Sequence, residues 1–512
     1  MMRDDGKTIP KGWYYIYPLL FGMAFAQKAI FTENQNTKFI TGLSLAKYGD
    51  IASDWMAGIT DPFPVFSHLL KWQYESLGLY AGVHLSFLLL AGLYSLFSIW
   101  LAKTLVPKGQ GQPKTLLVFS FLWLLIHTEG LRQLWGHFFP DGLAYQYLLG
   151  EYYQPCCFGV FLIGGIAAFQ SRQFILSWIC LIMAPLFHPA YLFVSSVLAL
   201  SMVLISFHAQ PDVSWKKRAG FLLLVFMVLI PLAQWNVSTL SSGTPVIQDN
   251  AYQILKEICI PHHSLPSHWS LRLTLQFFIV GFAAAWMEKK HLVGQVLFVL
   301  LSIAALSSVF NMMIQNPALV ALAPWRVSVL AAPVSWMILV TKTAKWISGK
   351  IQKRRDFLFQ RLKVRAMILI FIACLVGSME TYFNYQDKTK RPDYLISGFL
   401  AKHHEPKNLY LIPPELKNLR LEAGVPVFVT AKSNPTKDQE FLAWYERLKT
   451  AEELYRYPAT RKPSETARLL RDNTLTHILW PESQGLFPYE AIGHNVYTDK
   501  HFSLWDVRPV FE

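Results

Sequence analysis

The feature that most constrains the fold of this chain is a series of apolar segments, each long enough or nearly long enough to cross a lipid bilayer. A helix needs about 20 predominantly apolar residues to span a hydrocarbon core of roughly 30 Å. Such segments cover residues 13–31, 79–101, 115–127, 155–170, 174–187, 190–208, 219–235, 272–287, 292–310, 318–341 and 366–382. The sequence therefore predicts an all-α polytopic transmembrane helical bundle with about eleven spans.

The distribution of Lys and Arg along the chain predicts its orientation. The net charge of +14 could indicate nucleic-acid binding, but the basic residues cluster between the apolar segments. One set of alternate loops carries about 21 basic residues, nine of them between Lys342 and Arg365, whereas the other set carries only about five. Because cytoplasmic loops are the basic ones, we expect a cytoplasmic N-terminus, no nucleic-acid partner, and residues after about 383 outside. Cleavage of a signal peptide after Ala26 would leave this orientation unchanged.

The chain is expected to divide into two parts. Residues 1–382 form the transmembrane module, with a long first outer loop at residues 31–78. Residues 383–512 form a small extracytoplasmic α/β domain, in which we expect strands at 409–414, 425–431, 476–481 and 494–507 and helices at 437–454 and 464–472. The five cysteines lie in or near the spans and form no Cys-x-x-Cys pattern, so we expect neither a disulfide framework nor a cysteine metal site.

The first outer loop holds the candidate catalytic carboxylates Asp54, Asp50 and Asp61. Residues 36–56 place apolar side chains at roughly helical spacing, which predicts an amphipathic helix at the membrane surface. On such a helix Asp50 and Asp54 share a face, and their mutual repulsion would suit a general base or a cation site. The alternative is an ordinary solvated helix face, and Asp61 could simply cap the turn made by Pro62 and Pro64.

Arg326 is the most unusual residue within a predicted span. A guanidinium inside an apolar segment costs a few kcal/mol or more unless it is paired or reaches water. Arg326 is expected near the outer end of its helix, where its planar fork would suit a phosphate group. The alternative is that it extends to the membrane surface beside Trp325.

Histidines at the outer ends of the spans are candidates for substrate binding. They are His188, His262, His263 and His137. The second outer loop is rich in aromatic residues and also carries His127, Glu129, Arg132, Asp141 and Glu151. The histidines lack carboxylate or cysteine companions at zinc-binding spacing, so we expect them to donate hydrogen bonds around a polar cavity or to line the membrane surface. Divalent metal binding by the loop carboxylates is conceivable but not indicated.

Several distinctive segments resemble a family of bacterial polytopic membrane proteins without an assigned reaction. They are ENQNTKFITGLSL, SDWMAGITDPFPVFS, YYQPCCFGVFLIGG, FHPAY, PHHSLPSHW and PTKDQEFLAWYERL. The arrangement of many spans, a long acidic first outer loop and an outer C-terminal domain is similar to GT-C type glycosyltransferases. That resemblance implies a sugar donor on a polyprenyl phosphate carrier, with the base at Asp54, Asp50 or Asp61 and the lipid phosphate at Arg326. The adjacent acidic pair that many members carry in this loop is absent.

The favoured interpretation is therefore a glycosyltransferase of the bacterial inner membrane that modifies an envelope glycan, lipid or protein on the outer face. A transporter or flippase of a lipid-linked or anionic solute is the first alternative, although it predicts polar residues in the middle of spans. A non-catalytic envelope assembly protein is the second. The oligomeric state does not follow from the sequence.

Overall fold

The computed structural model describes residues 12–508, apart from 110, 139–140, 242–243, 315–316, 353–355 and 457–462. The chain forms two compact units. The first unit comprises residues up to 27, 84–237 and 252–382, and the second comprises residues 28–83, 238–251 and those from 383 onward. The first outer loop, expected to belong to the transmembrane module, thus lies in the same unit as the C-terminal domain.

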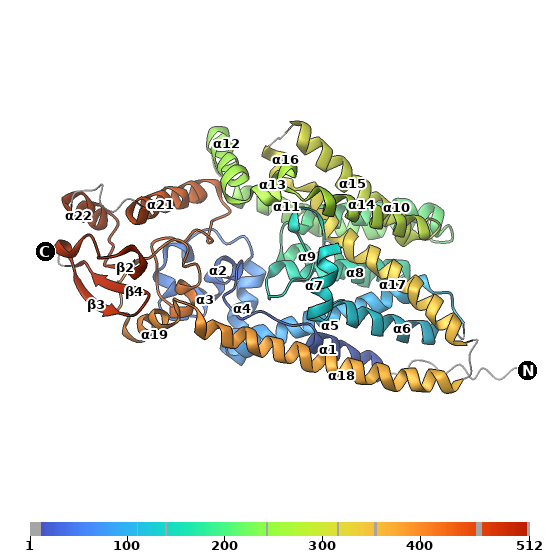
Figure 1. Ribbon diagram of the computed structural model, residues 1–512. Helices are drawn as coiled ribbons and strands as arrows, with labels where there is room; N and C mark the ends of the chain where they lie inside the picture. The colour runs from blue at the N-terminus through green and yellow to red at the C-terminus, as the bar shows by residue number, and fades with distance from the viewer. Residues whose placement is uncertain are drawn as a thin grey trace, which may run out of the picture. The chain divides into compact units, whose positions relative to one another are not determined.

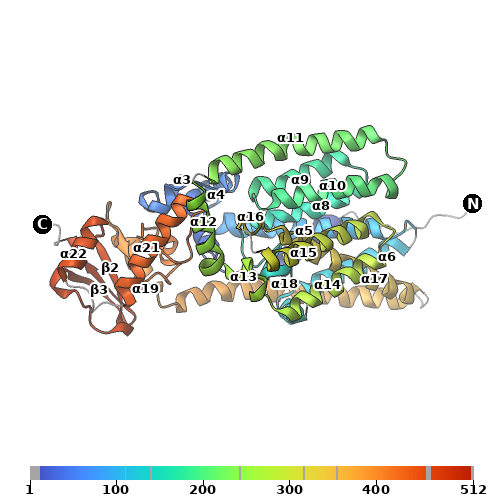
Figure 2. The same ribbon diagram turned by 90° about the horizontal axis from the view of Figure 1, so that it is seen from above.

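The first unit is a bundle of apolar helices (Figure 1). Its main helices are α1 (Trp13–Ala24), α5 (Leu79–Leu105), α6 (Gly111–Ile126), α8 (Val160–Gln170), α9 (Phe174–Phe187), α10 (Tyr191–Ala209), α11 (Trp215–Leu240), α14 (Leu271–Met287), α15 (Leu292–Ile314), α17 (Ser328–Gln352) and α18 (Asp356–Asp387). Helices α8, α9 and α10 pack side by side, as Figures 1 and 2 show. A Cβ at Gly165 would lie 2.9 Å from Leu181 Cδ2, so α8 and α9 approach closely at this glycine, and a larger residue would displace the Leu181 side chain.

Each of the eleven expected spans overlaps at least one helix in the described part of the chain. Six helices are long and apolar enough to cross a membrane, and five more apolar helices are shorter. The chain is thus a multi-pass membrane protein. The apolar segments alone were sufficient for this prediction because hydropathy depends only on local sequence.

One expected span is interrupted. Residues 318–341 do not form a continuous helix, because α16 (Pro317–Leu322) ends and a 3-10 turn, η7 (Pro324–Val327), precedes α17. Ala323 adopts a left-handed conformation with φ of 43°, and Pro324 cannot continue the hydrogen bonding of the preceding helix. Arg326 lies in this turn rather than inside a regular helix.

The second unit begins with short helices instead of the expected surface helix over residues 36–56. It contains α2 (Gln35–Lys38), α3 (Ile40–Leu45), η1 (Ile51–Ser53), η2 (Trp55–Ala57) and α4 (Pro64–Leu77). Gly49 has a positive φ of 54°, and Asp54 is extended between the two 3-10 turns. The expectation of one continuous helix, with Asp50 and Asp54 on a shared face, is therefore wrong.

The C-terminal part contains a four-stranded sheet in the order β1-β2-β4-β3. Its strands are β1 (Tyr410–Leu411), β2 (His477–Pro481), β3 (His494–Thr498) and β4 (Phe502–Asp506), with β1 parallel to β2 and the other pairs antiparallel. The helices are α19 (Tyr394–His403), α20 (Leu419–Ala423), α21 (Asp438–Arg456) and α22 (Pro463–Asp472). The expected strand at 425–431 is reduced to an isolated bridge between Tyr410 and Val427.

The sheet has apolar side chains on both faces because residues alternate along each strand. Leu479 and Leu504 pack in a buried core with Ile396 and Leu400 of α19. On the other face Trp480 stacks on Tyr455 of α21, at a ring separation of 5.9 Å. Figure 1 accordingly places α19 and α21 on opposite sides of the sheet. The small α/β domain predicted from the sequence is confirmed.

Candidate functional site

A polar cavity of about 430 Å³ lies within the first unit. Its wall includes Arg132, Asp141 and Glu151 from the second outer loop, together with His127 at the end of α6 and Tyr94 on α5. Ligand pockets usually have volumes of about 300–1,000 Å³ and a few polar groups in an apolar wall. The cavity therefore has the size and composition of a small-molecule or lipid-headgroup site.

Arg132 is held by two carboxylates at the rim of this cavity. Its Nη2 lies 2.6 Å from Glu129 Oε2 and 2.7 Å from Glu151 Oε1. Glu129 is in the first turn of α7 (Glu129–Phe138), where the helix dipole favours a negative charge, and Arg132 follows it by one turn. The positive charge of Arg132 is thus already matched by carboxylates of the chain.

Asp141 follows α7 and lines the same cavity. Asp141 is exposed by its accessible surface, so its carboxyl group can be reached from the cavity that it lines. Desolvation raises the pKa of Asp141 to about 6; Arg132 lowers it and Glu151 raises it further. This carboxyl group can therefore exchange protons near neutral pH, which is uncommon for an aspartate.

A second, smaller cavity of about 220 Å³ shares Gly136 and Asp141 with the first. It is also lined by residues 142–146 and by Trp269, Ser270, Leu273 and Thr274. Ala144 and Tyr145 are both left-handed, with φ of 58° and 56°. Such conformations cost of order 1–3 kcal/mol and cluster at functional sites.

Arg326 contacts Gln146, which lines this second cavity. Its Nε lies 3.4 Å from Gln146 Oε1, and the ring of the neighbouring Trp325 lies 5.7 Å from that of Trp269 in the cavity wall. Among the residues that the structure describes, no carboxylate forms an ion pair with Arg326. The helix break at η7 thus presents a guanidinium whose charge no described acidic side chain neutralises.

The four predicted histidines have different surroundings. His263 Nδ1 lies 2.6 Å from the carbonyl oxygen of Ala144 in the strained segment, and its ring lies 4.1 Å from that of His262. His188 ends α9, and its Nδ1 accepts a hydrogen bond from Ala190 N at 3.3 Å. His137 belongs to α7, but its side chain lies outside the described residues. Arg326 and His263 are therefore brought to the same segment, residues 144–146.

The three predicted aspartates belong to the second unit and lie in separate environments. Asp54 is fully buried: its Oδ1 accepts from Met56 N, and its Oδ2 accepts from Val427 N and faces Arg420. Asp50 Oδ2 lies 3.0 Å from His404 Nε2. Asp61 Oδ1 accepts from Phe63 N at 2.8 Å, the turn-capping contact considered as its alternative. Their catalytic role stays a prediction, and the burial of Asp54 argues against it as the base.

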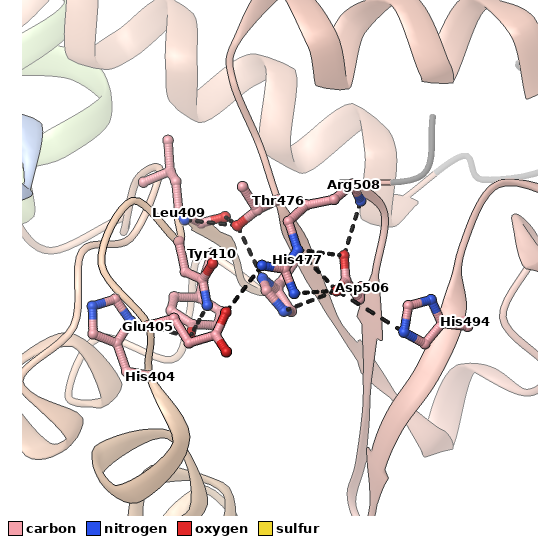
Figure 3. Close-up of polar contacts among 10 residues, drawn as sticks. His404, Glu405, Leu409, Tyr410, Thr476, His477, His494, Asp506 and Arg508 are labelled. Carbon is pink, nitrogen blue, oxygen red and sulfur yellow. Dashed lines mark hydrogen bonds and ion pairs between the residues drawn. The ribbon is translucent and has the colours of Figure 1, made fainter. Parts of the chain in front are cut away.

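These aspartates do not assemble a metal site. Across the described ranges, no three His, Cys, Asp or Glu side chains are grouped so that they could hold an ion. Figure 3 shows a polar cluster of the second unit around Asp506. The Nε of Arg508 lies 2.9 Å from Asp506 Oδ2, and its Nη1 lies 3.1 Å from Glu405. The carboxylates of this cluster are matched by arginine, so it is a structural network.

The residues of the second outer loop were visible in the sequence but were not ranked as catalytic candidates. Their signal was the density of ionisable and aromatic residues between two apolar spans, which marks a polar site in a membrane protein. Asp141 has no local pattern that separates it from Glu129 or Glu151. Only the three-dimensional structure shows that Arg132 forms ion pairs with Glu129 and Glu151.

Comparisons with known proteins were made for the whole chain. A family model described as a domain of unknown function, DUF6798, matches residues 396–451. No curated protein matches the sequence. Among solved structures, ArnT from Cupriavidus metallidurans bound to undecaprenyl phosphate has 10% identity, covers 96% of each chain and gives a TM-score of 0.44. The apo oligosaccharyltransferase of Archaeoglobus fulgidus has 10% identity, covers 97% of this chain and 74% of its own, and gives 0.45.

The resemblance to GT-C type glycosyltransferases expected from the sequence is consistent with these two structures. The TM-scores lie below 0.5 and the identities near 10%. The likeness therefore supports no assignment of residues, substrate or mechanism in this chain. Those assignments depend on the cavities and their side chains.

Proposed function

We propose that this protein is a membrane glycosyltransferase that takes a sugar from a polyprenyl phosphate carrier. The acceptor would be an envelope glycan, lipid or protein on the outer face of the bacterial inner membrane. The observation that carries the proposal is the guanidinium of Arg326, which lies beside a cavity at a break between apolar helices.

An arginine at such a position needs an anionic partner. Burial of an unpaired charge in an apolar environment costs several kcal/mol. Arg132, on the other cavity, already has Glu129 and Glu151, whereas Arg326 has only a 3.4 Å contact to Gln146 among the described side chains. A lipid phosphate would provide the missing negative charge, and its oxygens match the planar fork of arginine.

The chemistry follows from the same arrangement. Direct displacement at C1 of the sugar would leave a second negative charge on the departing polyprenyl phosphate. A preorganised positive group near the leaving oxygen stabilises this charge as it develops. Arg326 would do this, while the backbone of residues 142–146 and the polar rim of the cavity would position the sugar.

The composition of the second unit supports an outer location for the site. Residues 28–83, 238–251 and those after 383 belong to this unit, and all three segments are expected outside from the distribution of basic residues. The two cavities are likewise lined by segments expected at the outer ends of spans. A single topology, with the N-terminus cytoplasmic, is consistent with all of these positions.

The proposal is tested in a deletion strain restored with wild type, Arg326→Gln or Arg272→Gln at equal protein levels. Arg272 is an exposed arginine at the start of α14 and serves as the matched control. Mass spectrometry of envelope glycans and polyprenyl-linked sugars should show one sugar lost in the deletion strain, with its lipid-linked donor accumulating. Wild type and Arg272→Gln should restore it, and Arg326→Gln should not.

Two results would overturn the proposal. Unchanged glycans in the deletion strain would remove the transferase function and favour transport or envelope assembly. Equal restoration by Arg326→Gln and wild type would remove the phosphate role of Arg326.

A further inference from the structure

Asp141 is placed where the two cavities of the first unit meet. It lines both of them, and its side chain is accessible from the cavity. The smaller cavity is lined by Gln146, whose Oε1 lies 3.4 Å from Arg326 Nε, whereas the larger one is lined by Arg132 and Glu151. A substrate that occupied both cavities would pass Asp141 at the junction.

The carboxyl group of Asp141 has no strong partner within the described part of the chain. No hydrogen bond or ion pair of Asp141 is formed there, because Arg132 is directed at Glu129 and Glu151. Other titratable groups in the cavity wall are His127, whose Nδ1 lies 2.7 Å from Trp123 O, and the phenols Tyr94, Tyr147 and Tyr152. As far as the described residues show, the carboxyl oxygens of Asp141 can accept hydrogen bonds from a bound molecule.

The environment also sets the proton affinity of this group. Desolvation raises the pKa of Asp141 to about 6. An aspartate with a pKa in this range is still ionised at pH 7, yet it is a stronger proton acceptor than an ordinary carboxylate. In the first outer loop, Asp54 is instead buried against Arg420, and Asp50 lies 3.0 Å from His404.

We propose that Asp141 is the catalytic base that accepts the proton of the attacking acceptor hydroxyl, an inference that rests on the transferase function proposed above. The O–H bond of the acceptor breaks and its proton passes to the Asp141 carboxylate. The acceptor oxygen forms a bond to C1 of the sugar as the bond from C1 to the phosphate oxygen breaks. The electron pair stays on that oxygen beside Arg326, and Asp141 later returns its proton to the departing phosphate or to water.

The experiment compares wild type, Asp141→Asn and Arg326→Gln in two measurements. The first is restoration of the envelope sugar in the deletion strain. The second is binding of undecaprenyl methyl phosphate to the purified full-length protein in lipid nanodiscs. This probe is a phosphodiester with one negative charge between pH 5 and 8, like the lipid-linked donor, so its own charge does not change with pH.

We expect Asp141→Asn to reduce sugar transfer by at least 100-fold, the usual size of a general-base contribution, while probe binding at pH 5 stays within threefold of wild type. In wild type, binding should weaken between pH 5 and 7 because the ionised carboxylate repels the anionic probe. In Asp141→Asn this pH dependence should disappear. Arg326→Gln should lose probe binding at every pH.

The outcomes separate the two proposals. Normal restoration by Asp141→Asn, with loss in Arg326→Gln, would overturn the base assignment and leave the transferase function intact. Loss of probe binding in Asp141→Asn at pH 5 would also overturn it, because the residue would then be part of the binding site rather than the base. Unchanged glycans in the deletion strain would overturn both proposals.

Discussion

The Oδ2 atom of Asp54 lies 2.9 Å from Nε of Arg420, and both side chains are almost completely buried. The same oxygen accepts a hydrogen bond from Val427 N at 2.8 Å. This ion pair joins the loop after the first span to a segment more than 350 residues later in the same unit. Asp54, the carboxylate favoured from the sequence as a catalytic base, thus forms an ion pair that links two segments of the second unit.

Asp54→Asn should destabilise the protein by about 3–5 kcal/mol, because it leaves Arg420 as a buried charge without its partner. Asp61→Asn affects only a half-buried turn, so it should lower the free energy of unfolding by about 1 kcal/mol or less. Thermal unfolding of the purified protein measures both. Adding Arg420→Met to Asp54→Asn should recover part of the loss. Unchanged stability with lost transfer in Asp54→Asn would instead favour the catalytic role.

Gly49 and Gly424 provide a second test of the same contact region. A Cβ at Gly49 would lie 2.2 Å from the carbonyl oxygen of Gly424, and Gly49 also has a φ of 54°. A Cβ at Gly424, where φ is 68°, would lie 3.3 Å from its nearest neighbour, the Cα of Gly49. We expect Gly49→Ala to cost about 3 kcal/mol or more and Gly424→Ala about 1 kcal/mol. Equal unfolding temperatures for the two variants would contradict this close approach of the two backbones.

His477 should make the second unit less stable in acid. It is buried between Tyr410 and Asp506 (Figure 3), and burial lowers its pKa to about 4. Between pH 6.5 and 4 the unfolded state binds a proton that the folded state does not, so stability falls as the pH decreases. The loss between pH 7 and 5 should be about 2 kcal/mol. His477→Gln should lack this part of the pH dependence of thermal unfolding, whereas an unchanged profile would exclude the effect.

Glu151→Gln should shift the proton affinity of Asp141 downward. Glu151 raises the pKa of Asp141, and it also neutralises part of the positive charge of Arg132. Without Glu151 both effects favour the ionised carboxylate, so the pH at which probe binding weakens should move below that of wild type. Binding of undecaprenyl methyl phosphate between pH 4 and 8 measures the midpoint. An upward shift would show that the charges around Asp141 differ from those described.

The sequence was sufficient for the elements whose signals are local. Apolar runs predicted the helices of the bundle, and residues 494–507, expected as strand, form the two paired strands β3 and β4. Helices α21 and α22 began within one residue of the expected positions. The expected surface helix over 36–56 was wrong because α3 ends at Leu45, and Lys47 and Gly49 then adopt positive φ values of 55° and 54° that a helix cannot contain. The expected strand over 425–431 was wrong: within the described residues, this segment pairs with the sheet only through the isolated bridge between Val427 and Tyr410.

What the sequence by itself determined was the membrane class and the approximate list of helices, because bilayer thickness and backbone hydrogen bonding act on each segment separately. The tertiary structure alone decided the pairing of charges. Asp54 pairs with Arg420, and Arg132 pairs with two glutamates, whereas among the described residues Arg326 and Asp141 have no ion-pair partner. The physical reason is that charge neutralisation depends on distances of a few ångströms between segments far apart in the chain.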